Sequence, residues 1–349
     1  LEFRRVLFRS ELNNIALKIL SNGKGILAAD ESIGTMTKRL DSVNVPSKPE
    51  NRLLFREALF SSEKMKDCIG GVILFDETIN QITSTGKSIP KMIEEAGAVP
   101  GIKVDTGAKV LANSPEEKIT EGLDGLRERL KKYYELGARF TKWRGVYNIG
   151  KKYPSKLSIH SNAHALARYS ALAQECGMVP IVEPEILMDG DHTIEKTAEV
   201  QEKVLVEVYK ACSENNVFLE GTLLKPSMTV SGADNKNKAD SEEVAKMTVR
   251  TMNRCVPAAV PGIMFLSGGL TEEDASVYLN TMNSIEHKSS TSLTFSYGRA
   301  LQQSCLQAWK GSDIKAGQRA LMARCQANSE ASKGDYVSGS QPSSQEIGR

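Results

Sequence analysis

Eight short runs of apolar and β-branched residues alternate with longer segments of helical pattern along the chain. The runs are Gly25–Asp30, Ile69–Asp76, Val99–Asp105, Ala138–Val146, Met178–Ile186, Val217–Pro226, Gly262–Gly269 and Ser292–Arg299. Near-continuous apolar strands separated by helices are typical of a parallel sheet that is buried on both faces. Eight such units favour a closed barrel over an open doubly wound sheet. We therefore predict an α/β fold, a single-domain (β/α)8 or TIM barrel.

Short signals mark where the intervening helices begin and end. Asp240 and Thr271 are each followed three residues later by an acid, which is the pattern of a capping box. The segment Ser114–Glu117 (SPEE) combines a cap, a first-turn proline and early acids, so we predict that a helix begins there. Gly137 and Gly177 are placed where helices should end before the next strand.

The two ends of the chain differ in composition from the rest. Residues 1–10 (LEFRRVLFRS) alternate Arg with bulky apolar residues and are too short and interrupted for a secretory signal. Beyond Trp309 a helical pattern runs to about Asn328, and the Gly/Ser-rich residues 331–349 indicate a flexible tail. We expect residues 11–330 to form the barrel domain. Residues 1–10 and the final Glu346–Arg349 (EIGR) are expected to be foreign to the native protein.

Composition and charge exclude several classes of protein. The 45 Lys and Arg residues nearly balance 43 Asp and Glu, and the net charge of +2 argues against a nucleic-acid or membrane-surface protein. No apolar run reaches the roughly 18 residues of a membrane span. The six cysteines are scattered without a Cys-x-x-Cys pair, so we predict reduced thiols in a cytoplasmic protein. An anionic ligand must then be bound by a local cluster of cations.

The carboxyl ends of the predicted strands, where barrels of this type hold their active sites, are unusually polar. Residues two apart on a strand point the same way, so Lys142 should face the same side as Arg144, and Glu183 the same side as Glu185. Salt bridges at the rim of the barrel would explain any single pair of these charges. Charged residues recur at the ends of most strands, however, and ionised groups are rarely buried without partners or a function. These polar residues are Asp30, Asp76, Lys103, Asp105, Lys142, Arg144, Glu183, Glu185, Lys225, Ser267, Ser296 and Arg299.

Such a set of charges supports chemistry by a lysine amine. A lysine crowded by another ammonium, such as Lys225 near Lys142, is pushed towards its neutral and nucleophilic form. A neutral lysine can attack a ketone to form an imine, and the protonated imine withdraws electrons from an adjacent carbon–carbon bond, which can then break. Carboxylates such as Glu183 and Glu185 can move the required protons. Spacing alone leaves open whether Lys103, Lys142 or Lys225 is the nucleophile.

Two groups of residues are candidates for binding anions. The last two predicted strands end in Ser267–Gly269 and in Gly298 with Arg299; small residues let backbone N–H groups approach an anion, and Arg299 adds a planar charged fork. Phosphate sites after strands seven and eight recur in this barrel. A second group, which follows the first strand, contains Ser32, Thr35, Lys38 and Arg39. A solvated helix start is the alternative for Lys38 and Arg39. Two anion sites would suit a substrate with phosphates at both ends.

Seven motifs carry a resemblance to a known family. They are GKGILAADES (23–32), GIKVD (101–105), KWR (142–144), IVEPEIL (181–187), LEGTLLKP (219–226), FLSGG (265–269) and LTFSYGRAL (293–301). Together they strongly resemble the class I fructose-bisphosphate aldolases of eukaryotic type, over roughly residues 11–336. The resemblance implies a cytoplasmic, homotetrameric lyase that needs no metal or other cofactor. It would cleave fructose 1,6-bisphosphate to dihydroxyacetone phosphate and glyceraldehyde 3-phosphate through a Schiff base, in glycolysis and gluconeogenesis.

The resemblance also implies roles for individual residues. Lys225 matches the Schiff-base lysine and Glu183 the principal proton-transfer carboxylate. Asp30, Lys142 and Glu185 match their catalytic supports. The candidate residues for binding substrate and phosphate are Ser32, Thr35, Lys38, Arg39, Lys103, Arg144, Ser267, Gly268, Gly269, Ser296, Gly298 and Arg299.

Other functions are alternatives to this interpretation. A zinc-dependent aldolase would need metal ligands, but the four histidines (His160, His164, His192 and His287) lack an H-E-x-x-H motif. We predict that His160 and His164 form a surface pair. Another lysine barrel, such as a transaldolase, would explain Lys225 but not the full set of motifs. The alternative from a different class is an adaptor for actin or another cytoskeletal partner, because the family is known for such binding.

Overall fold

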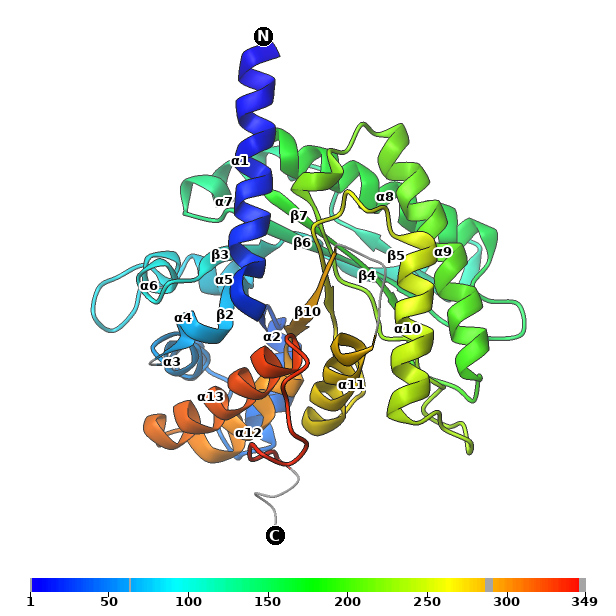
Figure 1. Ribbon diagram of the computed structural model, residues 1–349. Helices are drawn as coiled ribbons and strands as arrows, with labels where there is room; N and C mark the ends of the chain where they lie inside the picture. Colours follow the sequence, from blue (N-terminus) through cyan, green and yellow to red (C-terminus); the bar gives the residue numbers. More distant parts are fainter. Residues whose placement is uncertain (1, 63, 286–290, 345–349) are drawn as a thin grey trace.

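The computed structural model describes residues 2–62, 64–285 and 291–344. Within these residues, eight parallel strands form a closed barrel in the order β1-β10-β9-β8-β7-β6-β3-β2 (Figure 1). The predicted (β/α)8 barrel is confirmed. Its strands are β1 (Gly25–Ala29), β2 (Ile69–Leu74), β3 (Val99–Lys103), β6 (Phe140–Tyr147), β7 (Val179–Ile186), β8 (Leu223–Leu224), β9 (Gly262–Phe265) and β10 (Ser292–Tyr297).

Apolar side chains fill the barrel interior and its amino end. Phe140 is completely buried there, and a Cβ atom on Gly101 would come within 2.3 Å of its ring, so the neighbouring strand needs glycine at this position. The helix α1 (Glu2–Leu20) closes the amino end with Leu12, Ala16 and Ile19. Because this end is sealed by packed side chains, a ligand can enter only at the carboxyl ends of the strands.

Helices surround the barrel and bury their apolar faces against the strands. The predicted caps are confirmed, since the side chain of Asp240 accepts from Glu243 N at 2.9 Å and that of Thr271 from Asp274 N at 3.0 Å. The helices are α2 (Ile33–Asp41), α3 (Pro49–Phe60), α4 (Met65–Cys68), α5 (Asp76–Ile79), α6 (Ile89–Glu95), α7 (Leu126–Glu135), α8 (Lys156–Glu175), α9 (Ile194–Glu214), α10 (Ser241–Cys255), α11 (Glu272–Ser284), α12 (Arg299–Trp309) and α13 (Ile314–Ala331).

The prediction that a helix begins at Ser114–Glu117 is wrong. The chain instead forms an antiparallel hairpin of β4 (Gly107–Leu111) and β5 (Ser114–Glu121). The reason is the fate of Glu117: its carboxylate is buried and accepts from Ser155 N at 2.7 Å. An acid that resembles a local helix-capping residue therefore binds a loop 38 residues away in sequence.

The sixth predicted strand, Val217–Pro226, is much shorter than expected. Only Leu223–Leu224 pair as β8, and Leu219–Gly221 form a short 3₁₀ helix, η2. The side chain of Gln174 explains this, because it accepts from Phe218 N at 2.9 Å and donates to Phe218 O at 2.7 Å. Backbone groups bonded to a side chain in this way do not need a strand partner.

The tail also differs from its prediction. Residues 331–344 are not a free flexible segment: Tyr336 is 5% exposed, and its hydroxyl donates to Glu273 Oε2 at 2.8 Å. Buried polar groups on α11 and α13 bind this segment, and they lie too far away in sequence for composition to indicate them. The segment Glu346–Arg349 lies outside the described residues, and the expectation that residues 1–10 are foreign stays a prediction. None of the helices in the described ranges combines the length and apolar character that a membrane span requires.

Candidate active site

A cavity of about 390 Å³ opens at the carboxyl ends of the strands. It brings together side chains from nearly every strand, as the polar strand ends predicted. Its lining consists of Ala28, Asp30, Glu31, Ser32, Thr35, Arg39, Lys103, Lys142, Arg144, Glu183, Glu185, Lys225, Leu266, Ser267, Gly268, Ser296, Gly298 and Arg299.

Four ionisable side chains form the centre of this cavity, and we call Asp30, Lys142, Glu183 and Lys225 the mouth cluster. Lys142 Nζ, from β6, lies 2.7 Å from Asp30 Oδ2 and 3.1 Å from Glu183 Oε2. Lys225 Nζ, directly after β8, lies 3.2 Å from Glu183 Oε1. The Glu183 carboxylate on β7 therefore lies between two amino groups, one at each oxygen. Both lysine side chains are only 5% exposed.

The mouth cluster has strongly perturbed proton affinities. Burial alone would raise the pKa of Asp30 and of Glu183, but the positive charges of Lys142 and Lys225 outweigh burial and hold both values below the ordinary range. Burial would lower the pKa of Lys142, yet Asp30 and Glu183 raise it above its usual value. At neutral pH the two carboxylates are ionised and Lys142 carries a full charge.

Further charged pairs flank the mouth cluster. Arg144 Nε donates to Glu185 Oε2, and Lys103 Nζ lies 3.1 Å from Asp105 Oδ1. Parallel pairing sets this neighbourhood, because Arg144 on β6 is the register partner of Glu183 on β7. The predicted common orientation of Lys142 with Arg144, and of Glu183 with Glu185, is confirmed by their shared place in the lining.

One side of the cavity carries the candidate anion site after β9 and β10, and we call Ser267, Gly268 and Arg299 the α11–α12 anion site. Arg299 Nη2 donates to Gly268 O at 2.8 Å, which joins the loop after β9 to the start of α12. Gly268 has a φ of +53°, in the left-handed region that favours glycine. Ser296 Oγ is buried nearby and has no hydrogen-bond partner among the residues that the structure describes, so it is free to bind a ligand oxygen.

The candidate group on α2 lies beside this site, because β1 is the neighbour of β10 in the barrel and a Cβ atom on Gly298 would come within 3.8 Å of Arg39 Nη2. Ser32 caps this helix by accepting from Thr35 N at 3.3 Å, and Arg39 contributes a guanidinium to the lining. Two candidates lie outside the lining. Lys38 is exposed on α2, and Gly269 lines a neighbouring cavity of about 270 Å³ instead.

Glu31 is a lining residue that the sequence interpretation missed. Its carboxylate accepts from Arg39 Nη1 and from Gln302 Nε2, the latter at 2.9 Å, and Arg56 Nη2 lies 3.4 Å away. Glu31 thus fixes the direction of the Arg39 guanidinium. The sequence signal that could have identified Glu31 was its position between Asp30 and Ser32, in the motif that ends the first strand. Its hydrogen-bond partners, however, lie as far away in sequence as residue 302.

The histidines do not form a metal centre in the described part of the chain, where no group of three or more His, Cys, Asp and Glu side chains is arranged to hold an ion. His160 and His164 share the surface of α8 with their ring centroids 6.5 Å apart, and His160 Nδ1 contacts Glu207 Oε1 at 3.0 Å. His287 lies outside the described residues.

Comparison with known proteins places the chain in a family. The family model described as fructose-bisphosphate aldolase class-I matches residues 11–348. The chain is 54% identical to cytosolic fructose-bisphosphate aldolase 4 of Arabidopsis thaliana (93% of this chain, 84% of the relative) and 52% identical to fructose-bisphosphate aldolase B of Gallus gallus (94% and 92%). It is also similar to fructose-bisphosphate aldolase from Plasmodium falciparum, solved in complex with TRAP and a small-molecule inhibitor, with a TM-score of 0.93, 47% identity, and coverage of 95% and 96%. This chain belongs to the class-I fructose-bisphosphate aldolase family.

Proposed function

We propose that this protein is a cytoplasmic fructose-bisphosphate aldolase of glycolysis and gluconeogenesis. It would cleave fructose 1,6-bisphosphate reversibly to dihydroxyacetone phosphate and glyceraldehyde 3-phosphate. Family membership and the names of the relatives support this proposal. The observation that carries it is the placement of Lys225 Nζ, 3.2 Å from the Glu183 carboxylate, inside a cavity rich in cations.

The first half of the proposed reaction forms a Schiff base on Lys225. Glu183 accepts a proton from the Lys225 ammonium, and the neutral amine attacks the ketone carbon of the open-chain sugar. A proton moves from the attacking nitrogen to the carbonyl oxygen to give a neutral carbinolamine, and Glu183 stays protonated. Glu183 then returns its proton to the departing hydroxyl, water leaves, and a protonated imine remains. Lys142 stays charged beside these groups, because Asp30 and Glu183 raise its pKa despite its burial.

The second half breaks the carbon–carbon bond. A carboxylate, Glu183 in our proposal, removes the proton from the C4 hydroxyl, the C3–C4 bond breaks, and its electron pair moves into the imine to form an enamine. Glyceraldehyde 3-phosphate leaves as the aldehyde product. Protonation of the enamine at C3 regenerates the imine, and one water molecule hydrolyses it to release dihydroxyacetone phosphate and Lys225. The water lost in the first half is thus returned in the second.

The two anion sites account for the two phosphates of this substrate. The α11–α12 anion site offers backbone groups and a guanidinium, while Ser32 and Arg39 offer a hydroxyl and a second guanidinium in the neighbouring part of the cavity lining. Charge-assisted contacts of this type hold the sugar in one orientation, with its ketone towards Lys225.

The test is a cleavage assay with fructose 1,6-bisphosphate in which both triose phosphates are measured, with and without a chelator. We expect the wild type to produce both products, with no loss in the chelator. Lys225→Met should remove activity, while Lys203→Met, at an exposed lysine on α9, should retain it. A folded wild type without cleavage would contradict the proposal and favour the cytoskeletal adaptor. Activity lost in the chelator and restored by zinc would assign the zinc-dependent mechanism.

We also propose, from the family resemblance, that the protein assembles as a homotetramer. Sedimentation equilibrium should then give a mass near four times the 38.2 kDa of the chain. A mass equal to that of one chain at assay concentrations would contradict this assembly. A cytoskeletal partner such as actin remains a second proposal from the same resemblance, and it can be tested by co-sedimentation with filaments.

A further inference from the structure

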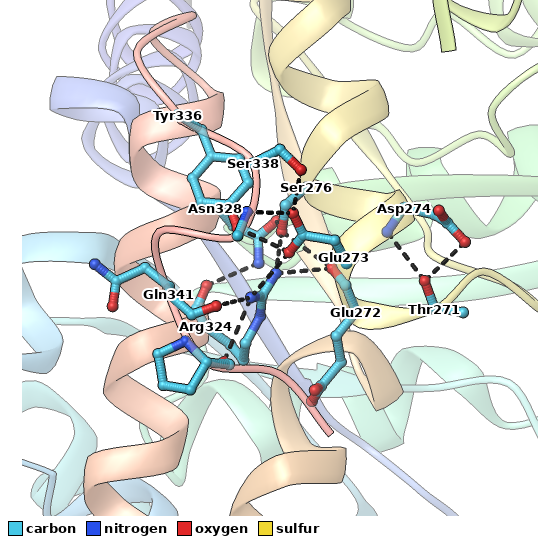
Figure 2. Close-up of polar contacts among 12 residues, drawn as sticks. Thr271, Glu272, Glu273, Asp274, Ser276, Arg324, Asn328, Tyr336, Ser338 and Gln341 are labelled. Atoms are coloured by element: carbon cyan, nitrogen blue, oxygen red, sulfur yellow. Dashed lines mark hydrogen bonds and ion pairs between the residues drawn. The ribbon is translucent and has the colours of Figure 1, made fainter. Parts of the chain in front are cut away.

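A second group of buried and partly buried charges lies outside the cavity, at the start of α11 (Figure 2). We call Glu272, Glu273 and Arg324 the anchor cluster. The Arg324 side chain, from α13, is 0% exposed. Its guanidinium donates to Glu272 O at 2.9 Å, to Ser276 Oγ and to the carbonyl of Gln341 at 3.2 Å. It thereby joins α13, the start of α11 and the C-terminal segment, which we define as residues 332–344.

The Glu272 carboxylate makes a different connection. It is buried and accepts from Ser304 N at 2.9 Å, from Ser304 Oγ, and from Ser344 N at 2.7 Å. Ser304 belongs to α12, so one carboxylate binds α11 to α12 and to the C-terminal segment. All three donors are neutral. If the carboxylate were replaced by a group that accepts fewer hydrogen bonds, some of these donors would lose their acceptor.

Glu273, the next residue, binds the C-terminal segment and also lies 3.4 Å from Arg324 Nη1 on α13. It accepts from Tyr336 Oη at 2.8 Å, from Ser338 Oγ at 2.9 Å and from Gly339 N at 2.9 Å. Among the described residues, no group on α12 donates a hydrogen bond to this side chain. The two adjacent glutamates therefore separate two roles, since both bind the C-terminal segment but only Glu272 reaches α12.

The helices that Glu272 joins are the ones that build the α11–α12 anion site. Its loop, Ser267–Gly269, ends three residues before Glu272, and Arg299 is the first residue of α12, five residues before Ser304. The two segments therefore meet twice: inside the cavity, where Arg299 donates to Gly268 O at 2.8 Å, and behind it, where Ser304 donates to Glu272. The rear contact limits how far the two segments can separate.

We propose that Glu272 is a positioning residue for the α11–α12 anion site, and that Arg324 supports it by fixing the Glu272 backbone. Glu272 sets the distance between the Gly268 loop and the Arg299 guanidinium, so that both reach one phosphate. This inference rests on the proposed function for its substrate, but the site geometry it describes also governs the binding of inorganic phosphate.

The test compares Glu272→Gln with the matched control Glu273→Gln. Glutamine keeps the size of the side chain but turns a donor towards Ser304 N or Ser344 N. For Glu272→Gln we expect the KM for fructose 1,6-bisphosphate to rise about tenfold, with kcat within about threefold of wild type, because binding and not the amine chemistry is disturbed. Inorganic phosphate, titrated by calorimetry, should bind about tenfold more weakly. Glu273→Gln should leave the KM and the phosphate affinity within about twofold of wild type, although it also loosens the C-terminal segment.

Two further measurements keep the inference open to refutation. If Glu272→Gln fails to fold, Ser304→Ala removes only the hydroxyl donor and should raise the KM about threefold. A lowered melting temperature with unchanged KM and phosphate affinity would show that Glu272 is a structural anchor alone. Equal losses in both glutamate variants would assign the effect to the C-terminal segment instead. Weaker phosphate binding in Glu272→Gln, in a protein without aldolase activity, would contradict the proposed function but leave this inference standing.

Discussion

The mouth cluster and the anchor cluster are both buried and both contain carboxylates beside cations, yet their partners differ in kind. In the mouth cluster each charged side chain is paired directly with another charged side chain in the lining of the cavity. In the anchor cluster most contacts of the charged groups go to backbone atoms and hydroxyls, and they hold segments of chain together. Backbone partners fix a geometry, whereas side-chain partners at a cavity leave the charges available to a ligand or a proton.

The direction of the carboxylate pKa shifts alone would not distinguish the mouth cluster from the anchor cluster. The pKa of Glu273 is also lowered, because hydrogen bonds from Tyr336, Gly339 and Ser338 outweigh its burial. The same direction of shift is seen for Glu183, where lysine charges are the cause. A perturbed carboxylate thus indicates a candidate for chemistry only when it also lines a cavity.

The largest expected effect comes from removing one cation from each cluster. Lys142→Met should lower kcat by roughly 10²–10⁴-fold, because the charge that stabilises the ionised carboxylates is lost. It should also lower the free energy of unfolding, because Asp30 and Glu183 lose the buried charge that holds their pKa values down. Arg324→Met should lower the free energy of unfolding by about 3–5 kcal/mol, as expected when a buried ionic partner is removed, but its kcat should stay close to wild type because Arg324 does not line the cavity.

Steady-state kinetics and urea unfolding measured on both variants check this contrast. Arg324→Lys serves as the control, because it keeps the charge but loses the planar fork. A Lys142→Met protein that unfolds more easily than Arg324→Met while retaining its kcat would reverse the roles of the two clusters.

An intermediate effect is expected at the two anion sites. Each lost charge-assisted phosphate contact should cost about 1.5–3 kcal/mol. Arg299→Ala should weaken the binding of dihydroxyacetone phosphate as well as of the bisphosphate, while Arg39→Ala should mainly raise the KM for the bisphosphate. Binding measurements with both ligands distinguish the sites. If neither variant differs from wild type, the phosphates have been placed wrongly.

The smallest effect concerns the dependence of stability on pH. The folded-state pKa values of Asp30 and Glu183 lie below their unfolded values, so their stabilisation is present above about pH 4 and is lost as pH falls through the folded values. Each unit of difference corresponds to about 1.4 kcal/mol. Lys142→Met should flatten this acid limb, because burial would then raise both pKa values relative to wild type.

Urea unfolding at a series of pH values from 3 to 7 measures this slope. Lys203→Met, which changes an exposed lysine, is the control and should keep the wild-type curve. An acid limb of the same steepness in Lys142→Met would mean that this lysine does not set the carboxylate pKa values.

The sequence predicted the barrel and most of the cavity, because both depend on local pattern. Apolar runs identify strands, and alternation on a strand places Lys142 with Arg144. Predictions failed where a distant group decided the outcome: Glu117 binds Ser155 instead of starting a helix. Glu31 was missed because its partners on α3 and α12 cannot be read from its own neighbourhood.

The packed C-terminal segment was missed for the same physical reason. Its Gly/Ser-rich composition indicates little preference for any structure by itself. Its position depends on Glu273 and Arg324, which the packing of α11 against α13 brings together. Such contacts exist only once the barrel has formed, so single-sequence reasoning has no signal for them.

The most direct test of the account is to locate the nucleophile chemically. The protein is incubated with dihydroxyacetone phosphate, reduced with borohydride, digested, and the adduct is located by mass. Reduction converts an imine to a stable secondary amine, and we predict one major adduct, at Lys225. Lys142 should remain unlabelled because Asp30 and Glu183 hold its pKa above the usual range despite its burial. Lys225→Met should abolish the adduct. An adduct on Lys142 or Lys103 would overturn the assignment of roles, and no adduct on any lysine of the folded protein would contradict the Schiff-base mechanism.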